Sequence, residues 1–283
     1  MRVRRRLRAL GRVLGASLFV VVFNALAFVV LLALPPAAGV LWGAFLGSAF
    51  VLWHLQDDGR RRERLARIRL RPARASHRWL AVAVGASLAL LWGLTGVIGW
   101  LAPPLGPDAM RGWEPLLDYI HRPGGWLAVA VLVAGVAPVV EEFCFRGHVQ
   151  HTLERWWGTA PAIIVATLLF TVGHVGRPHW SILLVPLTLG LVNGTVVWLA
   201  RSIWPAVVIH GLWNLAMVST ELTSGDAPAA VDDVPEAALL ATALVLLGVG
   251  LAGWGWLLRK GRPPARSAGA GREGAFPSPP GPL

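Results

Sequence analysis

The stretch WLAVAVLVAGVAPVVEEFCFR, residues 126–146, places two carboxylates and a guanidinium directly after a long apolar run. Residues 126–140 contain no charged side chain, and Glu141, Glu142 and Arg146 follow them. Ionisable side chains at membrane depth are energetically costly and are in most cases functional. We therefore expect a functional site inside a membrane-spanning helix.

The overall composition is typical of a membrane protein. Of the 283 residues, 55% are hydrophobic and 14% are charged, whereas soluble domains contain about 45–50% apolar residues even when glycine is counted. The formal net charge is +11, but the basic residues cluster beside the apolar segments, as in cytoplasmic loops rather than nucleic-acid-binding surfaces. The single cysteine, Cys144, excludes an intramolecular disulfide. We expect a protein that contacts membrane lipid and no nucleic acid.

Eight apolar segments are long enough to cross or nearly cross a bilayer, which takes about 20 residues in a helix. We therefore predict an all-α, polytopic membrane protein with about eight transmembrane helices. The predicted spans are residues 14–34, 37–53, 79–102, 126–140 with an extension, 160–175, 180–200, 203–218 and 237–258.

The positions of the basic residues predict the orientation. If eight spans alternate from a cytoplasmic N-terminus, all but three of the 26 lysines and arginines fall on the cytoplasmic side. Lys260 is the only lysine, which together with abundant alanine, glycine and proline hints at a GC-rich bacterial genome. We expect an integral protein of a bacterial plasma membrane with both termini in the cytoplasm.

In the first polar motif, the two glutamate side chains point to different sides of the helix. Glu142 and Arg146 are i,i+4 neighbours, so they can form a salt bridge on one helix face. Successive residues of a helix are rotated by about 100°, and Glu141 therefore points elsewhere. A carboxylate held in a partly dry cavity can act as a general base. The alternative is a structural cluster of ion pairs at the membrane face.

Two further polar pairs lie one helical turn apart inside apolar segments. Phe170 precedes His174 by one turn, so its ring can shield the imidazole from lipid. His210 precedes Asn214 by one turn, and both side chains can donate hydrogen bonds. Such donors suit the oxyanion that forms when water attacks an amide carbonyl. Together with Glu141, these pairs predict one buried active site.

The three motifs resemble those of the CPBP membrane proteases, also called the ABI or CAAX-protease-and-bacteriocin-processing family, which includes the type II endopeptidase of prenylated CAAX proteins. That family is marked by E-E-x-x-x-R, F-x-x-x-H and H-x-x-x-N-type motifs on successive membrane helices. The resemblance covers Trp126 to about Ser219 and includes the stretch from Gly190 to Gly194. The matching residues are Glu141, Glu142 and Arg146, then Phe170 and His174, then His210 and Asn214.

The resemblance implies an intramembrane endopeptidase that hydrolyses a membrane-associated protein or peptide. It implies that Glu141 activates water, that His174 helps to position this water, and that His210 and Asn214 stabilise the oxyanion. The residues that would support the site structurally are Glu142, Arg146 and Phe170.

The sequence leaves the involvement of a metal open. Glu141, His174 and His210 could supply three ligands to zinc and leave a position for water. This agrees with the metalloprotease label that the family often carries. However, the H-E-x-x-H pairing of zinc proteases is absent, and the same residues can bind water directly. We prefer a mechanism without an obligatory metal.

Two other classes of protein compete with the enzyme. A non-catalytic membrane scaffold or bacteriocin-immunity-type protein could use the same fold to bind a partner. A small-solute transporter would require inverted repeats, and we find none. The complete set of Glu141, His174, His210 and Asn214 favours the enzyme.

We divide the chain into four segments. Residues 1–122 carry N-terminal transmembrane helices and a basic cytoplasmic loop that anchors to anionic lipid, and residues 123–219 form the CPBP-type protease core. Residues 220–259 contain an acidic loop and the last transmembrane helix, and residues 260–283 form a disordered cytoplasmic tail.

The depth of the site poses a difficulty, because Glu141 ends a span at the cytoplasmic side, whereas His174 lies about 21 Å into a span that starts there. The two meet only if the helix of Glu141 continues past Gly147 at depth, or if a helix tilts or breaks.

Overall fold

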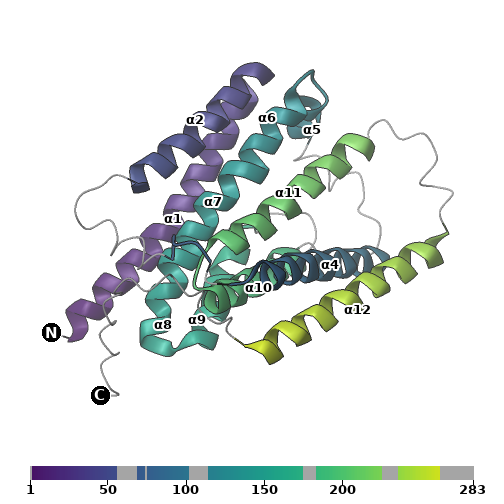
Figure 1. The fold of residues 1–283 in the computed structure, drawn as a ribbon. Helices are drawn as coiled ribbons and strands as arrows, with labels where there is room; N and C mark the ends of the chain where they lie inside the picture. The colour runs from purple at the N-terminus through teal and green to yellow at the C-terminus, as the bar shows by residue number, and fades with distance from the viewer. Residues whose placement is uncertain are drawn as a thin grey trace.

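The computed structural model describes residues 2–55, 69–73, 75–101, 114–174, 183–224 and 235–261. Within these ranges all regular secondary structure is helical, which confirms the all-α prediction, and the helices pack side by side in a bundle (Figure 1). Outside the long helix described next, the elements are α1 (Arg2–Ala33), α2 (Pro36–Leu55), α4 (His77–Leu101), α5 (Glu114–Ile120), α9 (Thr159–Val172), α10 (Leu184–Ala200), α11 (Trp204–Ser224) and α12 (Glu236–Lys260).

One long helix, Gly125–Trp157, carries the first motif at its middle. It alternates between α-helical and π-helical turns. Turns of the π type are rare in proteins, and those that occur often lie at functional sites. The predicted span at residues 126–140 therefore continues well beyond the motif. Its consecutive parts are α6 (Gly125–Ala130), a π-helical stretch Val131–Val136, α7 (Ala137–Glu142), a second π-helical stretch Phe143–Gln150 and α8 (His151–Trp157).

The turn at Gly158 brings Glu141 and His174 to the same depth. Gly158 has φ 80° and separates α8 from α9, which runs back beside the long helix. At 1.5 Å per residue, Glu141 and His174 each lie roughly 25 Å along the chain from this turn. The depth difficulty is resolved because the helix of Glu141 continues past Gly147 without a break.

The helices have the length and composition of membrane spans. Within the described ranges, four are long and apolar enough to cross a bilayer: Val13–Ala33, His77–Leu101, Gly125–Trp157 and Glu236–Lys260. Large apolar side chains such as Leu18 and Val245 are exposed on the surface of the bundle, as expected where lipid is the solvent. The protein is therefore an all-helical membrane protein, and the count of eight spans stays a prediction. Three shorter apolar helices are Pro36–Phe50, Thr159–Val172 and Leu184–Ala200.

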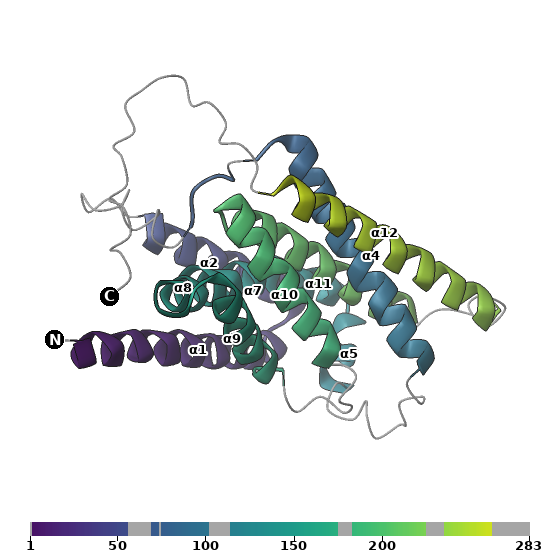
Figure 2. The ribbon, with the colours of Figure 1, turned by 90° about the horizontal axis from the view of Figure 1, so that it is seen from below.

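The helices α4 and α12 form a closely packed pair beside α10 and α11 (Figure 2). A Cβ atom on Gly93 would lie 2.3 Å from the backbone nitrogen of Leu247, and one on Gly250 would lie 2.5 Å from that of Leu90. Small residues let helix backbones approach in membranes, where apolar burial alone gives little driving force.

A short irregular segment, residues 69–73, lies across the turn between α10 and α11. The backbone nitrogen of Ile203 donates to the carbonyl of Arg69 at 2.9 Å, and the hydroxyl of Ser202 donates to the carbonyl of Arg71 at 2.6 Å. The guanidinium of Arg69 pairs with Glu154 on α8. The lipid anchoring expected for the basic loop stays a prediction, because residues 60–68 and 74 lie outside the described residues.

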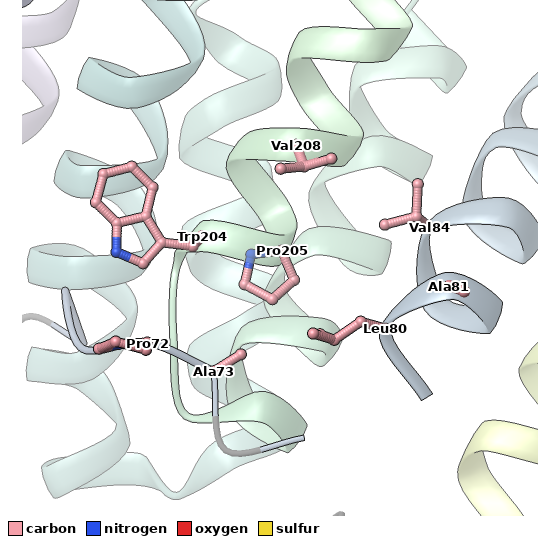
Figure 3. Close-up of a pocket in the computed structure, with 8 residues that line it drawn as sticks. All are labelled: Pro72, Ala73, Leu80, Ala81, Val84, Trp204, Pro205 and Val208. Atoms are coloured by element: carbon pink, nitrogen blue, oxygen red, sulfur yellow. The ribbon is translucent and has the colours of Figure 1, made fainter. Parts of the chain in front are cut away.

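An apolar groove of about 570 Å³ opens where this segment meets α4 and α11 (Figure 3). None of the predicted site residues lines it, because His210 lies on the buried face of α11 whereas Val208 is exposed. The groove is therefore separate from the candidate site. Its lining residues are Pro72, Ala73, Leu80, Ala81, Val84, Trp204, Pro205 and Val208.

The ends of several helices gather at one end of the bundle. The start of α1, the turn between α8 and α9, the start of α11 and the end of α12 lie toward the same end (Figure 1). Arg155, Arg201 and Arg259 lie there at helix ends. This is the distribution that the positive-inside rule expects, and the assignment of this end to the cytoplasm stays a prediction.

The predicted four-segment division also stays a prediction. Helices from residues 1–122 and 123–219 share hydrophobic clusters, in which Val20 of α1 and Trp79 of α4 belong to the same cluster as Phe143. Most of the acidic loop, residues 225–234, and nearly all of the tail, residues 262–283, lie outside the described residues.

Candidate active site

The imidazole of His210 lies between the two carboxylates of the first motif. Its Nδ1 lies 3.0 Å from Oε1 of Glu142, and its Nε2 lies 3.7 Å from Oε2 of Glu141. A carboxylate only accepts hydrogen bonds when ionised, so Nδ1 carries the proton of the first contact. The Nε2 atom therefore faces Glu141, at a distance slightly beyond a direct hydrogen bond.

Glu142 is the centre of a buried polar cluster. Its Oε2 accepts from Nε of Arg146 at 3.1 Å, which is the predicted i,i+4 salt bridge. Its Oε1 accepts from the side-chain amide of Asn193 on α10 at 2.9 Å, in addition to His210. The carboxylate is only 1% exposed. A buried charge is tolerated when it is paired and hydrogen-bonded, and Glu142 meets both conditions.

Arg146 is fully buried and tied to this cluster. Its guanidinium lies over the ring of Phe170, 5.5 Å from the centroid, a cation–π arrangement. Within the described residues its Nη1 and Nη2 have no hydrogen-bond partner. Glu142 is thus the one anion that the structure pairs with this guanidinium among those residues.

Phe170 joins the second and third motifs. Its ring centroid lies 4.8 Å from that of His174 and 5.7 Å from that of His210. His174 follows the end of α9 in a turn, and its Nδ1 donates to the carbonyl of Phe170 at 3.0 Å. The predicted proximity of Phe170 and His174 is confirmed, although the helix ends at Val172 rather than continuing to residue 175.

Asn214 lies one turn along α11 from His210 and contacts the long helix. Its amide donates to the carbonyl of Val133, within the first π-helical stretch, at 2.9 Å. The close approach of α11 depends on Gly211, because a Cβ atom there would lie 2.7 Å from the carbonyl oxygen of Ala134. The amide of Asn214 has two hydrogens, of which Val133 accepts one.

Glu141 receives a contact from the N-terminal helix. The amide of Asn24 on α1 donates to Oε1 of Glu141. Oε2 of Glu141 is buried and accepts no hydrogen bond from the described residues. Sequence reasoning assigned no role to Asn24 or Asn193, yet both are single asparagines inside apolar helical segments, which was the available signal.

The structure therefore brings some of the predicted site residues into direct contact and others only into indirect contact. Glu141 and His210 face each other directly, and His174 joins them through Phe170. Asn214 contacts Val133 on the same long helix.

The described residues contain no group of three or more His, Cys, Asp or Glu side chains placed to hold a metal ion. Glu141, His174 and His210, the candidate zinc ligands, are not assembled into such a group. Both nitrogens of His210 face carboxylates, and Nδ1 of His174 faces a carbonyl. The arrangement does not fit a three-ligand zinc site, and no step of the reaction below is assigned to a metal.

The fold and the site define an all-helical membrane protein with a buried cluster of carboxylates, imidazoles and amides. Residues 123–216 match the family model described as Rce1-like, type II CAAX prenyl endopeptidase Rce1-like. The resemblance to CAAX-type membrane proteases drawn from the three motifs is therefore confirmed for this segment of the chain. No curated protein and no solved structure matches the chain.

Proposed function

We propose that the protein is an intramembrane endopeptidase that hydrolyses a peptide bond of a membrane-associated protein or peptide, with Glu141 as the general base. One observation carries this proposal. Oε2 of Glu141 is buried, accepts no hydrogen bond from the described residues, and lies 3.7 Å from Nε2 of His210. A base and a potential donor thus face one another in a site that excludes bulk water.

In the proposed reaction, Oε2 of Glu141 takes a proton from water as the water oxygen bonds to the peptide carbonyl carbon. The carbonyl oxygen becomes an oxyanion, which Nε2 of His210 and the second amide hydrogen of Asn214 stabilise. Since Nδ1 of His210 already donates to Glu142, the imidazole donates from Nε2 only as an imidazolium. Glu141 then gives its proton to the leaving amine, and the C–N bond breaks.

His174 helps to hold the attacking water in this proposal. Its Nδ1 donates to the carbonyl of Phe170, which fixes the orientation of the imidazole. Its side chain is half-buried and lies at the depth of Glu141 along the α8–α9 hairpin. Correct placement of a reactant within a few tenths of an ångström supports catalysis strongly.

The test is cleavage by the purified full chain in liposomes. A panel of fluorogenic peptides should include a prenylated C-terminal peptide, the same peptide without the prenyl group, and a transmembrane peptide. We expect wild type to cleave at least one of them. Glu141→Gln should lose at least about 100-fold in kcat, as expected for loss of general-base catalysis. His174→Ala should lose about as much, because the attacking water is no longer held in place. Glu236→Gln, an exposed carboxylate on α12, serves as the matched control.

The outcomes separate the enzyme from its alternatives. Cleavage that persists in both variants would contradict the assigned mechanism. A wild-type protein that cleaves no peptide but binds one of them with the same affinity as Glu141→Gln would favour the non-catalytic scaffold.

A further inference from the structure

Asn24 interrupts an otherwise apolar packing face of α1. Val20 and Ala27, which lie four residues before it and three residues after it, are both buried. Residues at this spacing share one helix face, so an apolar side chain would fit the position of Asn24. Asn24 itself is partly buried, and the described partner of its amide is Glu141.

The contact divides the two oxygens of the Glu141 carboxylate. Oε1 accepts from Asn24, whereas Oε2 faces Nε2 of His210 at 3.7 Å. The last side-chain torsion of a glutamate is otherwise broadly distributed. A hydrogen bond to one oxygen fixes the plane of the carboxylate and keeps the other oxygen directed toward the imidazole.

The contact also joins two separate parts of the chain. Asn24 belongs to α1, outside the segment at residues 123–216 that matches the family model. The helix α1 packs beside α7 and the second π-helical stretch of the long helix (Figure 2). The side chain that donates to Glu141 therefore comes from outside the segment that carries the three motifs.

We propose that Asn24 of α1 is a positioning residue for the proposed peptidase, which holds the Glu141 carboxylate in its reactive orientation through Oε1. This inference rests on the proposed function. An alternative role, in which Asn24 only fastens α1 to the bundle, predicts a loss of stability without a specific loss of turnover.

The experiment compares kcat and KM of the full chain in liposomes for wild type, Asn24→Leu and Asn24→Gln. Leucine keeps the approximate volume without a donor, and glutamine keeps the amide on a longer side chain. We expect Asn24→Leu to lower kcat by about 10- to 100-fold with KM within about twofold, since small misplacements of reacting groups have effects of this size. Asn24→Gln should recover part of kcat.

A matched control lies on the same helix. Ser17→Ala removes a hydroxyl whose hydrogen bond among the described residues stays within α1, to the carbonyl of Val13 at 3.0 Å, and should leave kcat unchanged. A double-mutant cycle, followed by thermal unfolding in detergent, supplies a measurement that does not depend on turnover. Asn24→Leu should lower the unfolding midpoint in wild type but not in a Glu141→Leu background, because coupling between contacting residues disappears when one partner is absent.

Each outcome decides the inference. A kcat for Asn24→Leu within twofold of wild type, a loss confined to KM, or equal midpoint shifts in both backgrounds would overturn the positioning role and leave the peptidase intact. A wild-type protein that cleaves no peptide overturns the proposed function and this inference together, which distinguishes the two failures.

Discussion

Nδ1 of His210 lies 3.0 Å from Oε1 of Glu142, the same carboxylate that carries the buried salt bridge to Arg146. One side chain thus orients the imidazole of the third motif and neutralises the guanidinium of the first. The two adjacent glutamates therefore have different surroundings. Glu142 holds its neighbours in place, and Glu141 is left to face Nε2 of His210.

Glu142→Gln should therefore reduce both stability and activity. The variant leaves the guanidinium of Arg146, which is fully buried, without its counter-charge. Breaking a buried ion pair by removing one partner costs about 3–5 kcal/mol. We expect a clearly lower unfolding midpoint in detergent and a loss of peptide cleavage.

The double variant Glu142→Leu with Arg146→Met separates the two effects. Replacing a whole buried ion pair by apolar residues is often neutral for stability, so the unfolding midpoint should recover toward wild type. Activity should stay low, because His210 no longer has an acceptor at Nδ1. Recovery of cleavage in the double variant would contradict the orienting role of Glu142.

Asn193→Leu should destabilise the site from the side of α10. The amide of Asn193 donates to Glu142 at 2.9 Å in a fully buried position. Hydrogen bonds to charged groups contribute about 1.5–3 kcal/mol. We therefore expect the free energy of unfolding, measured by chemical denaturation, to fall by about this amount. Thr195→Val on the same helix is the control, because in the described part of the chain its exposed hydroxyl donates to the carbonyl of Leu191 within α10. Equal losses in the two variants would argue against a special role for Asn193.

The sequence predicted the contacts that depend on helical spacing. The salt bridge between Glu142 and Arg146 and the ring contact between Phe170 and His174 each join residues four positions apart. Helical spacing accounts for the first pair, and His174 lies in the turn just after α9. The three-motif pattern correctly indicated the family model that residues 123–216 match. The functional roles of these residues stay predictions until cleavage is measured.

Contacts between distant helices could not be predicted in the same way. Asn24 meets Glu141 across 117 residues, and its partner depends on how α1 packs against the long helix. The continuation of that helix to Trp157 could not be predicted either, because Gly147 permits a break and no sequence signal marks the π-helical turns. These two features complete the environment of Glu141 and set its depth.

Removal of divalent metal ions should leave cleavage intact. The described His, Cys, Asp and Glu side chains do not gather into a three-ligand group, and both nitrogens of His210 face carboxylates. We expect the same kcat before and after dialysis against a zinc chelator, measured with the peptide that wild type cleaves best. A loss that added Zn²⁺ restores would show that the site rearranges to bind the ion.

Gly211→Ala should separate α11 from the long helix. A Cβ atom at residue 211 would lie 2.7 Å from the carbonyl oxygen of Ala134, so one backbone must shift. Because His210 directly precedes Gly211 in α11, we expect the distance between His210 and Glu141 to grow and kcat to fall by about tenfold or more. Kinetics in liposomes and thermal unfolding in detergent measure the two effects.

Gly135→Ala is the matched control for this variant. Gly135 neighbours Ala134 in the first π-helical stretch, but a Cβ atom there would meet nothing within 4 Å. Both substitutions raise helix propensity by about 1 kcal/mol, so propensity alone predicts that both variants become more stable. Steric contact predicts the opposite sign for Gly211→Ala only. A more stable and fully active Gly211→Ala protein would therefore show that the close approach of α11 to Ala134 does not position His210.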